Sequence, residues 1–259
     1  LNIKKYKKAN LKKWREISYL QKNPKNSVSI GIIGKYIELK DAYKSLSEAL
    51  YHSGIHSSTE IKIIWINAEK LVNINSALKN LNGILIPGGF GKRGILGKIS
   101  SIKFARENNI PFLGICFGMQ LAVIEYAQNV INIKNASSSE FKIKNAKNII
   151  GLMTEWIKDG KNIKRNINTD YGGSMRLGSY ECILQNKSLI HRIYKKNIIE
   201  ERHRHRYEMN IKYESLFKEN GMIISGKSPD GMLPEIVELP GHKWYLGVQF
   251  HPELSSQPL

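Results

Sequence analysis

The chain has 259 residues, of which 41% are hydrophobic and 24% are charged, a composition typical of a globular protein with one large or two small domains. Two cysteines cannot build a disulfide framework, and no apolar run approaches the ~20 residues that span a bilayer, so disulfide-rich secreted proteins and membrane-spanning proteins are excluded. The 40 basic and 22 acidic residues give a net charge of +18, which usually suggests an anionic partner such as nucleic acid, an anionic membrane or a nucleotide, with a compositional bias toward Lys, Asn and Ile as the alternative.

The first 27 residues differ in character from the rest of the chain. They contain nine Lys or Arg residues against one acid, Glu16, and residues 23–27 carry the Asn, Pro and Ser typical of a loop. We therefore expect residues 1–27 to be a basic linker between domains and residues 28–259 to form one domain. The chain starts at Leu1 and shows no signal peptide, so we expect a cytoplasmic piece of a longer protein.

Short apolar runs and helical periodicities alternate through the first half of the domain. The spacing predicts strands at residues 28–33, 61–66, 83–86 and 111–115, and helices at residues 39–53, 68–81, 95–108 and 120–128, with Gly54 ending the first helix. Such alternation is typical of an α/β fold with a doubly wound, mostly parallel sheet flanked by helices. Beyond residue 135, strand-like runs at 179–184, 222–225, 234–239 and 244–250 predict an antiparallel extension of the sheet.

Residues 114–120 (Gly-Ile-Cys-Phe-Gly-Met-Gln) place a cysteine between glycines where a strand should meet a helix. This pattern is typical of a nucleophile elbow, a strained turn whose neighbours must be small. A cysteine there lies at a helix N-terminus, which favours the thiolate. Cys116 is therefore the candidate nucleophile, although a buried packing role is the common fate of a free cysteine. Cys182 has no such surroundings and is expected to be a packing residue.

The run at 244–250 ends in His251-Pro252-Glu253. A cysteine nucleophile needs a base for its proton, and the base needs a carboxylate that orients its imidazole. His251 and Glu253 fit these two roles, provided that the fold brings them to Cys116.

Glycines also follow the strand expected at residues 83–86, in the segment Pro87-Gly88-Gly89-Phe90-Gly91. They offer unhindered N–H groups near the sheet edge, and acyl transfer needs such donors for the developing oxyanion. The N–H groups of Gly89 and Phe117 are the candidates for this oxyanion hole, and a simple turn is the alternative.

Together these three motifs resemble the class I, triad-type glutamine amidotransferase domains. The segments at residues 34–50, 139–141, 154–156, 172–178 and 201–208 are further similar to the glutaminase domains of the CTP synthase family. The resemblance extends over residues 28–256. Phe117 departs from the family pattern, in which Leu is usual, but either residue supplies the same N–H.

The resemblance implies that glutamine is hydrolysed to glutamate and ammonia through a thioester on Cys116, with His251 as acid and base and Glu253 as its orienting carboxylate. It implies that Glu140 binds the α-ammonium group of glutamine and Arg206 its α-carboxylate, a contact that suits the forked guanidinium. The remaining glutamine-binding residues that it implies are Gly89, Phe117, Gly118, Met119 and Gln120.

The same resemblance implies partners beyond this chain. In that family the ammonia passes to a preceding synthase domain, which uses ATP and Mg to aminate UTP to CTP in pyrimidine biosynthesis, and GTP activates glutamine hydrolysis as an allosteric effector. The complete enzyme would be a homo-oligomer. The resemblance implies no metal or cofactor in this domain and no membrane partner.

Other interpretations remain open on the sequence. Another triad amidotransferase, a γ-glutamyl hydrolase, or a basic polyanion-binding module on the same fold would share many of these features, although we consider nucleic acid a poor fit. Residues 31–36 lack the spacing of a phosphate loop. In residues 202–206, strand alternation predicts the arginines on one face and His203 and His205 on the other, and no partner cluster suggests a metal.

Overall fold

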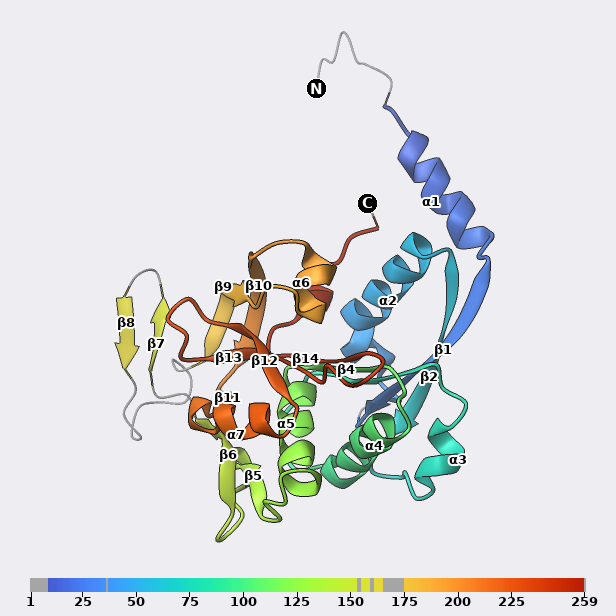
Figure 1. Cartoon of the computed structure of the whole chain (residues 1–259). Helices are drawn as coiled ribbons and strands as arrows, with labels where there is room; N and C mark the ends of the chain where they lie inside the picture. The colour runs from blue at the N-terminus through green and yellow to red at the C-terminus, as the bar shows by residue number, and fades with distance from the viewer. Residues whose placement is uncertain (1–8, 36, 153–154, 159–160, 165–174, 259) are drawn as a thin grey trace.

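A computed structural model describes residues 9–35, 37–152, 155–158, 161–164 and 175–258 (Figure 1). Its centre is a nine-stranded sheet with the order β10-β9-β12-β13-β14-β4-β3-β1-β2. The five strands from β14 to β2 run parallel. They are β14 (Tyr245–Val248), β4 (Phe112–Ile115), β3 (Gly83–Ile86), β1 (Asn26–Gly34) and β2 (Thr59–Asn67).

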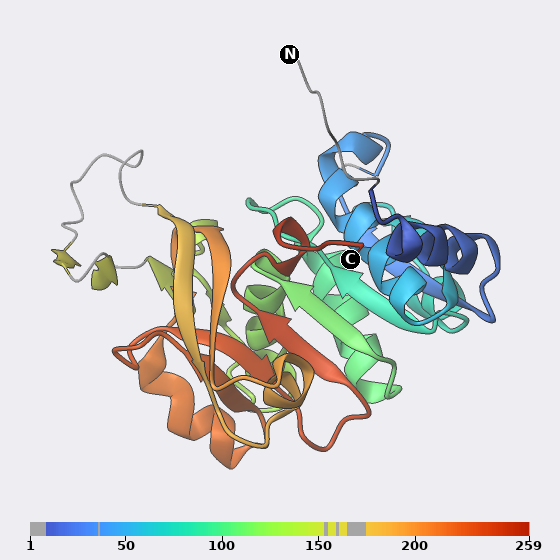
Figure 2. The same ribbon diagram turned by 90° about the horizontal axis from the view of Figure 1, so that it is seen from above.

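The other four strands of this sheet pair antiparallel to their neighbours. They are β10 (Ile198–His205), β9 (Arg176–Leu184), β12 (Ile223–Lys227) and β13 (Pro234–Glu238). The predicted fold class, a doubly wound parallel sheet with an antiparallel extension, is therefore confirmed. In the view from above, β14 and β4 lie side by side at the middle of the sheet, where the two parts meet (Figure 2).

Helices cover both faces of the sheet. Helix α2 (Lys44–His56) lies on one side, and α4 (Ile95–Glu107) and α5 (Phe117–Asn129) lie on the other (Figure 1). Strand alternation explains why two cores result, because Ile32 packs with the cluster that contains Leu46 of α2, whereas its neighbour Ile33 packs with the cluster under α4 and α5.

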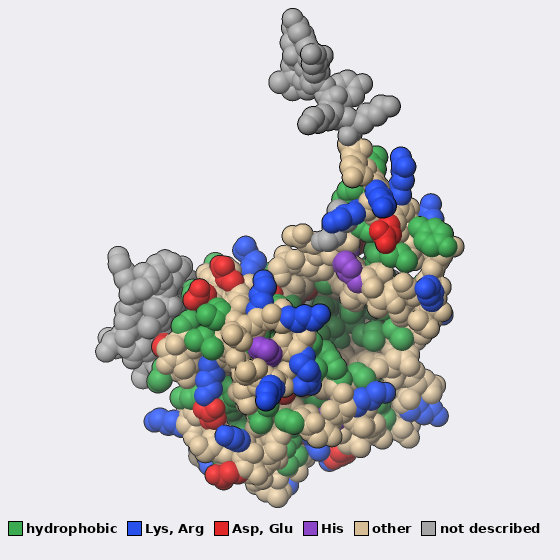
Figure 3. Space-filling model, turned by 45° about the horizontal axis from the view of Figure 1, so that its top comes forward, with side chains coloured by type: hydrophobic (Ala, Val, Ile, Leu, Met, Phe, Trp, Pro, Cys, Tyr) green, Lys and Arg blue, Asp and Glu red, His purple; other side chains and the backbone are tan. Residues whose placement is uncertain are grey.

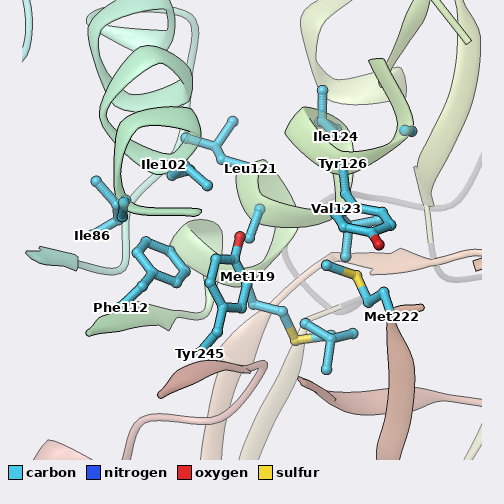
Figure 4. Packing of buried hydrophobic residues seen from close by; sticks show 14 of the residues in the cluster. Ile86, Ile102, Phe112, Met119, Leu121, Val123, Ile124, Tyr126, Met222 and Tyr245 are labelled. Atoms are coloured by element: carbon cyan, nitrogen blue, oxygen red, sulfur yellow. The ribbon is translucent and has the colours of Figure 1, made fainter. Parts of the chain in front are cut away.

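The larger core joins α4 and α5 to the sheet. Figure 4 shows Ile102, Met119 and Leu121 from the helices packed around Phe112 and Tyr245 from the strands. The rings of Phe112 and Tyr245 lie 4.5 Å apart. Helix α5 is buried over almost its whole length, and this fixes the position of the residue at its N-terminus, Cys116.

Smaller elements complete the structure. They are α1 (Lys12–Lys22), η1 (Lys40–Tyr43), α3 (Ile74–Leu78), η2 (Ser139–Phe141), α6 (Leu189–Tyr194), η3 (Ile211–Tyr213), α7 (Glu214–Glu219) and η4 (Pro252–Leu254). A second sheet has the order β11-β6-β5, and β7 pairs with β8 in a third. Their bounds are β5 (Ala136–Ser138), β6 (Lys147–Leu152), β7 (Glu155–Lys158), β8 (Lys161–Lys164) and β11 (Tyr207–Met209).

Several expected elements differ in the structure. The stretch expected to be a linker contains α1, which buries none of its residues and extends away from the sheet (Figure 1). Gly54 lies inside α2 and does not end the helix. A Cβ at this position would come 2.6 Å from the carbonyl oxygen of Thr59, so a glycine is needed here for close packing of the helix against the following strand. The helix expected over residues 68–81 is reduced to α3.

Parts of three segments that carry the resemblance, Tyr36, Thr154 and residues 172–174, lie outside the described residues. No helix in the described ranges is both long and apolar enough to cross a bilayer.

Candidate active site

Cys116 lies between β4 and α5 with φ +51° and ψ −101°, which is a strained conformation for a residue with a side chain. Its N–H donates to the carbonyl oxygen of Val248 at 2.6 Å. The neighbouring glycines permit this turn, because a Cβ at Gly118 would lie 2.1 Å from the carbonyl oxygen of Ile86, and a Cβ at Gly114 would strike the Gly118 backbone. The predicted nucleophile elbow is therefore present.

The elbow opens into a cavity of about 690 Å³ beyond the carboxyl ends of the parallel strands. Among the residues that line it are seven of the predicted site residues: Gly89, Cys116, Gln120, Glu140, Arg206, His251 and Glu253. Five separate segments of the chain supply them. Figure 3 shows the surface hollowed near the centre of the view, with more Lys and Arg than Asp and Glu side chains on this face.

His251 and Glu253 lie at the start of η4, directly beyond β14. Nδ1 of His251 lies 2.8 Å from Oε1 of Glu253, and the backbone N–H of His251 donates to the carbonyl oxygen of Arg202 at 2.8 Å. Nε2 is buried without a hydrogen-bond partner among the described residues, which leaves it available for proton exchange with the cavity. The carboxylate thus fixes both the tautomer and the direction of the ring.

The charge state of His251 reflects its neighbours. Burial alone would lower its pKa, but the interactions with the sulfur of Cys116 and the carboxylate of Glu253 outweigh burial and raise the pKa to about 10. His251 therefore carries a proton at neutral pH when Cys116 is a thiolate, which suits the donation of a proton to a leaving amine.

The backbone of the loop after β3 packs against the ring of His251. A Cβ at Gly88 would lie 2.7 Å from Cε1 of His251, so only a glycine allows the ring to rest against the backbone. At Gly89 the space is open, with the nearest atom, on the Phe117 ring, 3.9 Å from an added Cβ. The N–H of Phe117 lies in the first turn of α5, where helical geometry provides no carbonyl acceptor.

Two side chains of opposite charge, Glu140 and Arg206, line the cavity. Oε1 of Glu140 accepts the N–H of Gly91 at 2.7 Å; burial raises the pKa of this carboxyl, and the Gly91 N–H and the Lys35 charge oppose the rise. Nε of Arg206 is buried and has no hydrogen-bond partner in the described part of the chain. An α-amino acid carries one group for each of them.

Of the elbow residues expected to bind glutamine, only Gln120 lines the cavity. The side chains of Phe117 and Met119 lie in the core, and neither these two residues nor Gly118 line the cavity, so any contact with a substrate would use their backbones. Gln120 lines the cavity, but its Nε2 donates to the carbonyl oxygen of Tyr207 at 2.8 Å and to Oε1 of Gln249 at 3.1 Å. Its amide nitrogen is thus already engaged within the protein.

A cluster of buried ionisable side chains lies behind the site and is not signalled by the sequence. Nη2 of Arg176 lies 2.6 Å from Oε1 of Glu235, and Nη1 lies 3.5 Å from Oε1 of Glu208. Nδ1 of His205 approaches the same Glu208 oxygen at 3.5 Å. Arg176 and Glu208 belong to segments that carry the resemblance, but nothing local in those segments shows that they meet.

The two histidines of β10 join this cluster. The predicted alternation is confirmed within β10, because His203 and His205 are buried while Arg202 and Arg204 are exposed; Arg206 lies beyond the end of this strand and is half-buried. Nδ1 of His203 lies 2.9 Å from Nε2 of His205, and burial lowers the pKa of each ring, so both are neutral and one donates to the other. No group of three ligand-type side chains suited to a metal occurs among the residues that the structure describes.

Lys98 on α4 is a second buried charge that the sequence did not reveal. Its side chain is 1% exposed, and Nζ lies 5.0 Å from the centre of the Phe117 ring. Burial, with a smaller effect from Lys35, lowers the pKa of Lys98 from 10.5 to about 8. The ammonium group is therefore held in the fold at a cost in stability, which the ring offsets only in part.

We expect Lys98→Met to increase the free energy of unfolding at pH 7 by about 1 to 3 kcal/mol, since each pKa unit corresponds to about 1.4 kcal/mol. Because the pKa is depressed in the fold, the unfolded chain binds the proton more tightly, and the stability of the unmutated chain rises between pH 8 and 10.5. Urea unfolding at several pH values should show the advantage of the variant vanish over this interval. A variant that is less stable at pH 7 would contradict this account.

Cys182 is fully buried, as expected for a packing residue, and burial raises the pKa of its thiol. The two cysteines therefore differ in environment, because Cys116 lines the cavity with a histidine beside it and Cys182 does not.

Comparison with known proteins agrees with these features. A family model described as glutamine amidotransferase class-I matches residues 38–259. CTP synthase of Pelagibacter ubique is 57% identical over 259 residues, covering 99% of this chain and 48% of the relative. CTP synthase of Zymomonas mobilis is 52% identical over 252 residues, covering 96% of this chain and 46% of the relative. The chain thus spans about half the length of these curated relatives.

Solved structures give the same result. The glutaminase domain of Trypanosoma brucei CTPS, solved with bound acivicin, superposes with a TM-score of 0.78 at 35% identity, covering 89% of this chain and 88% of that domain. A glutamine amidotransferase from Thermotoga maritima superposes with a TM-score of 0.51 at 12% identity, covering 87% of this chain and 76% of that one, and at this identity it supports the fold alone.

Proposed function

The chain belongs to the class I glutamine amidotransferase family and corresponds to the glutaminase half of CTP synthases, and from that premise we propose that it hydrolyses L-glutamine to glutamate and ammonia at Cys116. The observation that carries this proposal is the convergence of Cys116, His251 and Glu253 on one cavity, although Cys116 and His251 are 135 positions apart in sequence. Unlike an isolated motif, this arrangement supplies nucleophile, acid–base and orienting carboxylate together.

The reaction proceeds in two halves. The thiolate of Cys116 attacks the side-chain amide carbon of glutamine, and the N–H groups of Gly89 and Phe117 stabilise the resulting oxyanion. The imidazolium of His251 gives its proton to the amide nitrogen, ammonia departs, and a thioester remains. His251 then takes a proton from water, the hydroxide adds to the thioester, and the thiolate leaves with release of glutamate.

Substrate selection follows from the charges of the cavity. Glu140 binds the α-ammonium group and Arg206 the α-carboxylate, which places the side-chain amide toward Cys116. The backbones of Phe117, Gly118 and Met119, together with Gln120, close the pocket around the substrate. Asparagine, which is one methylene shorter, would not reach the sulfur while both end groups are bound.

The fate of the ammonia is proposed from the relatives. We assign ATP, Mg, and the amination of UTP to CTP to the half of the CTP synthases that this chain does not match, and GTP to an allosteric role on glutamine hydrolysis. The synthase half is then the partner of this domain, within a homo-oligomer of the complete enzyme. A nucleophilic thiol requires reducing conditions, which agrees with a cytoplasmic location.

A diazo-ketone analogue of glutamine tests nucleophile and substrate in one experiment. Attack by the thiolate should attach one molecule of reagent per chain, and peptide mass spectrometry should find it on Cys116 and not on Cys182. Added L-glutamine should slow the labelling, whereas L-asparagine should not. Labelling of Cys182, or none at Cys116 in folded chain, would overturn the proposed function.

A further inference from the structure

Gln249 lies between β14 and His251, and its side chain is fully buried against the nucleophile. Nε2 of Gln249 lies 3.6 Å from Sγ of Cys116, a normal separation for an N–H donor and a sulfur acceptor. The backbone N–H of Gln249 donates to the carbonyl oxygen of Glu235 at 2.8 Å, which fixes the position of the residue. Neither the sequence motifs nor the triad assigns a role to this amide.

The orientation of the Gln249 amide follows from its neighbours. The carbonyl oxygen of Tyr207 can only accept, so the group of Gln120 that faces it at 2.8 Å must be the NH₂ group. That same NH₂ group faces Gln249 at 3.1 Å, so Gln249 must present its oxygen to Gln120. The NH₂ group of Gln249 is thereby directed at the sulfur.

The sulfur has different partners in its two protonation states. A thiol can donate weakly to the carbonyl oxygen of Arg204, which lies 4.0 Å from Sγ. A thiolate has no proton to donate and needs donors instead, and a hydrogen bond to an anion is about twice as strong as one between neutral groups. The buried N–H of Gln249 is such a donor, and it is separate from His251.

We propose that Gln249 is a catalytic residue whose side-chain amide donates a hydrogen bond to Sγ of Cys116 and stabilises the thiolate, while Gln120 acts as a positioning residue that holds this amide in place. The inference rests on the proposed function, because it concerns the same nucleophile. It gives Gln120 a structural role in addition to any contact with glutamine.

The test is the pH dependence of the alkylation of Cys116 by iodoacetamide, which reacts with the thiolate and requires no glutamine. Gln249→Met keeps the length of the side chain and removes the donor, so we expect the midpoint of the alkylation profile to rise by about one pH unit. Gln249→Glu keeps the shape but places an acceptor or an anion beside the sulfur, so the midpoint should rise further.

A second measurement separates a catalytic effect from damage to the pocket. In glutamine hydrolysis, Gln249→Met should lower kcat by about tenfold with little change in KM, since the amide contacts the nucleophile and not the substrate. Gln120→Met should give a smaller rise of the alkylation midpoint than Gln249→Met, because the donor remains but is no longer oriented.

The proposal is overturned if folded Gln249→Met and Gln249→Glu, checked by near-ultraviolet circular dichroism, both alkylate with the midpoint of the unmutated chain. If Gln249→Met does not fold, the isosteric Gln249→Glu decides alone; if neither folds, an unchanged midpoint in Gln120→Met overturns the proposal and a raised one supports it. Failure of the proposed function is recognised separately, because Cys116 of the unmutated chain would then resist the diazo-ketone reagent.

Discussion

Replacing Cys116 by alanine is expected to reduce glutamine hydrolysis by at least about 10⁴-fold, the size of effect seen when an acyl-transfer nucleophile is removed. Neither His251 nor the oxyanion donors can substitute for the sulfur, because the thioester cannot form. Ammonia release measured with a coupled assay, at a glutamine concentration well above KM, checks the result. Activity within tenfold of the unmutated chain would contradict the assignment of the nucleophile.

The fold should survive this change, and a glycine variant provides the matched control. Since Cys116 has φ +51°, glycine is the one residue that adopts its conformation without strain. In an ordinary helix or strand glycine is less stable than alanine by roughly 0.5 to 1 kcal/mol. At the elbow we expect Cys116→Gly to be at least as stable as Cys116→Ala in urea unfolding, with both inactive. A markedly less stable glycine variant would argue against a strained elbow.

Removal of the buried guanidinium is expected to have the largest effect on stability. Arg176→Met would leave Glu235, which is completely buried, without a cationic partner among the described residues; a neutral histidine at 3.4 Å and the thiol of Cys182 would remain beside it. An uncompensated buried charge typically costs about 3 to 5 kcal/mol. Urea unfolding at pH 7 should show this loss, and a loss below about 1 kcal/mol would show that the ion pair is not needed.

Glu208→Gln changes the same cluster, but this substitution is expected to increase the stability of the fold. Burial, only partly offset by Arg176, raises the pKa of Glu208 to about 8 from an ordinary value of 4.5, so in the fold it keeps its proton at neutral pH. The stability that this proton provides is complete below pH 4.5 and is lost as the pH rises through 8. The variant has no such proton to lose.

We therefore expect Glu208→Gln to match the unmutated chain at pH 4 and to exceed its stability by a few kcal/mol at pH 8. Unfolding curves at the two pH values give the comparison. Equal stability of the two proteins at both pH values would show that Glu208 is ionised in the fold.

The strands and the elbow were predictable because their causes are local. The runs at residues 83–86 and 111–115 match β3 and β4 closely, since buried parallel strands are apolar on both faces. The prediction of a helix over residues 68–81 was wrong in length, because the apolar periodicity there is weak and only residues 74–78 form a helix, α3. Helix α1 was missed because the excess of basic residues and the loop signal at residues 23–27 favoured a linker, although Trp14, Ile17 and Leu20 recur at helical spacing.

The roles of Gln249, Lys98 and the Arg176 cluster were not predictable in this way. Each depends on contacts between segments far apart in the chain: Gln249 meets Cys116, Lys98 lies beside the Phe117 ring, and Arg176 contacts carboxyl groups from β11 and β13. No periodicity or motif encodes such a meeting, because the residues involved are polar and would be placed at the surface by composition alone.

The sequence by itself determined the alternation of strands and helices from β1 to α5, the strained turn at Cys116 and the candidate catalytic side chains, since these depend on backbone sterics and on side-chain chemistry within a few residues. Only the tertiary structure decided which groups share the cavity, which amide faces the sulfur and which buried groups keep their protons. Protonation and hydrogen bonding depend on distance and on exclusion of water, and packing of remote segments sets both.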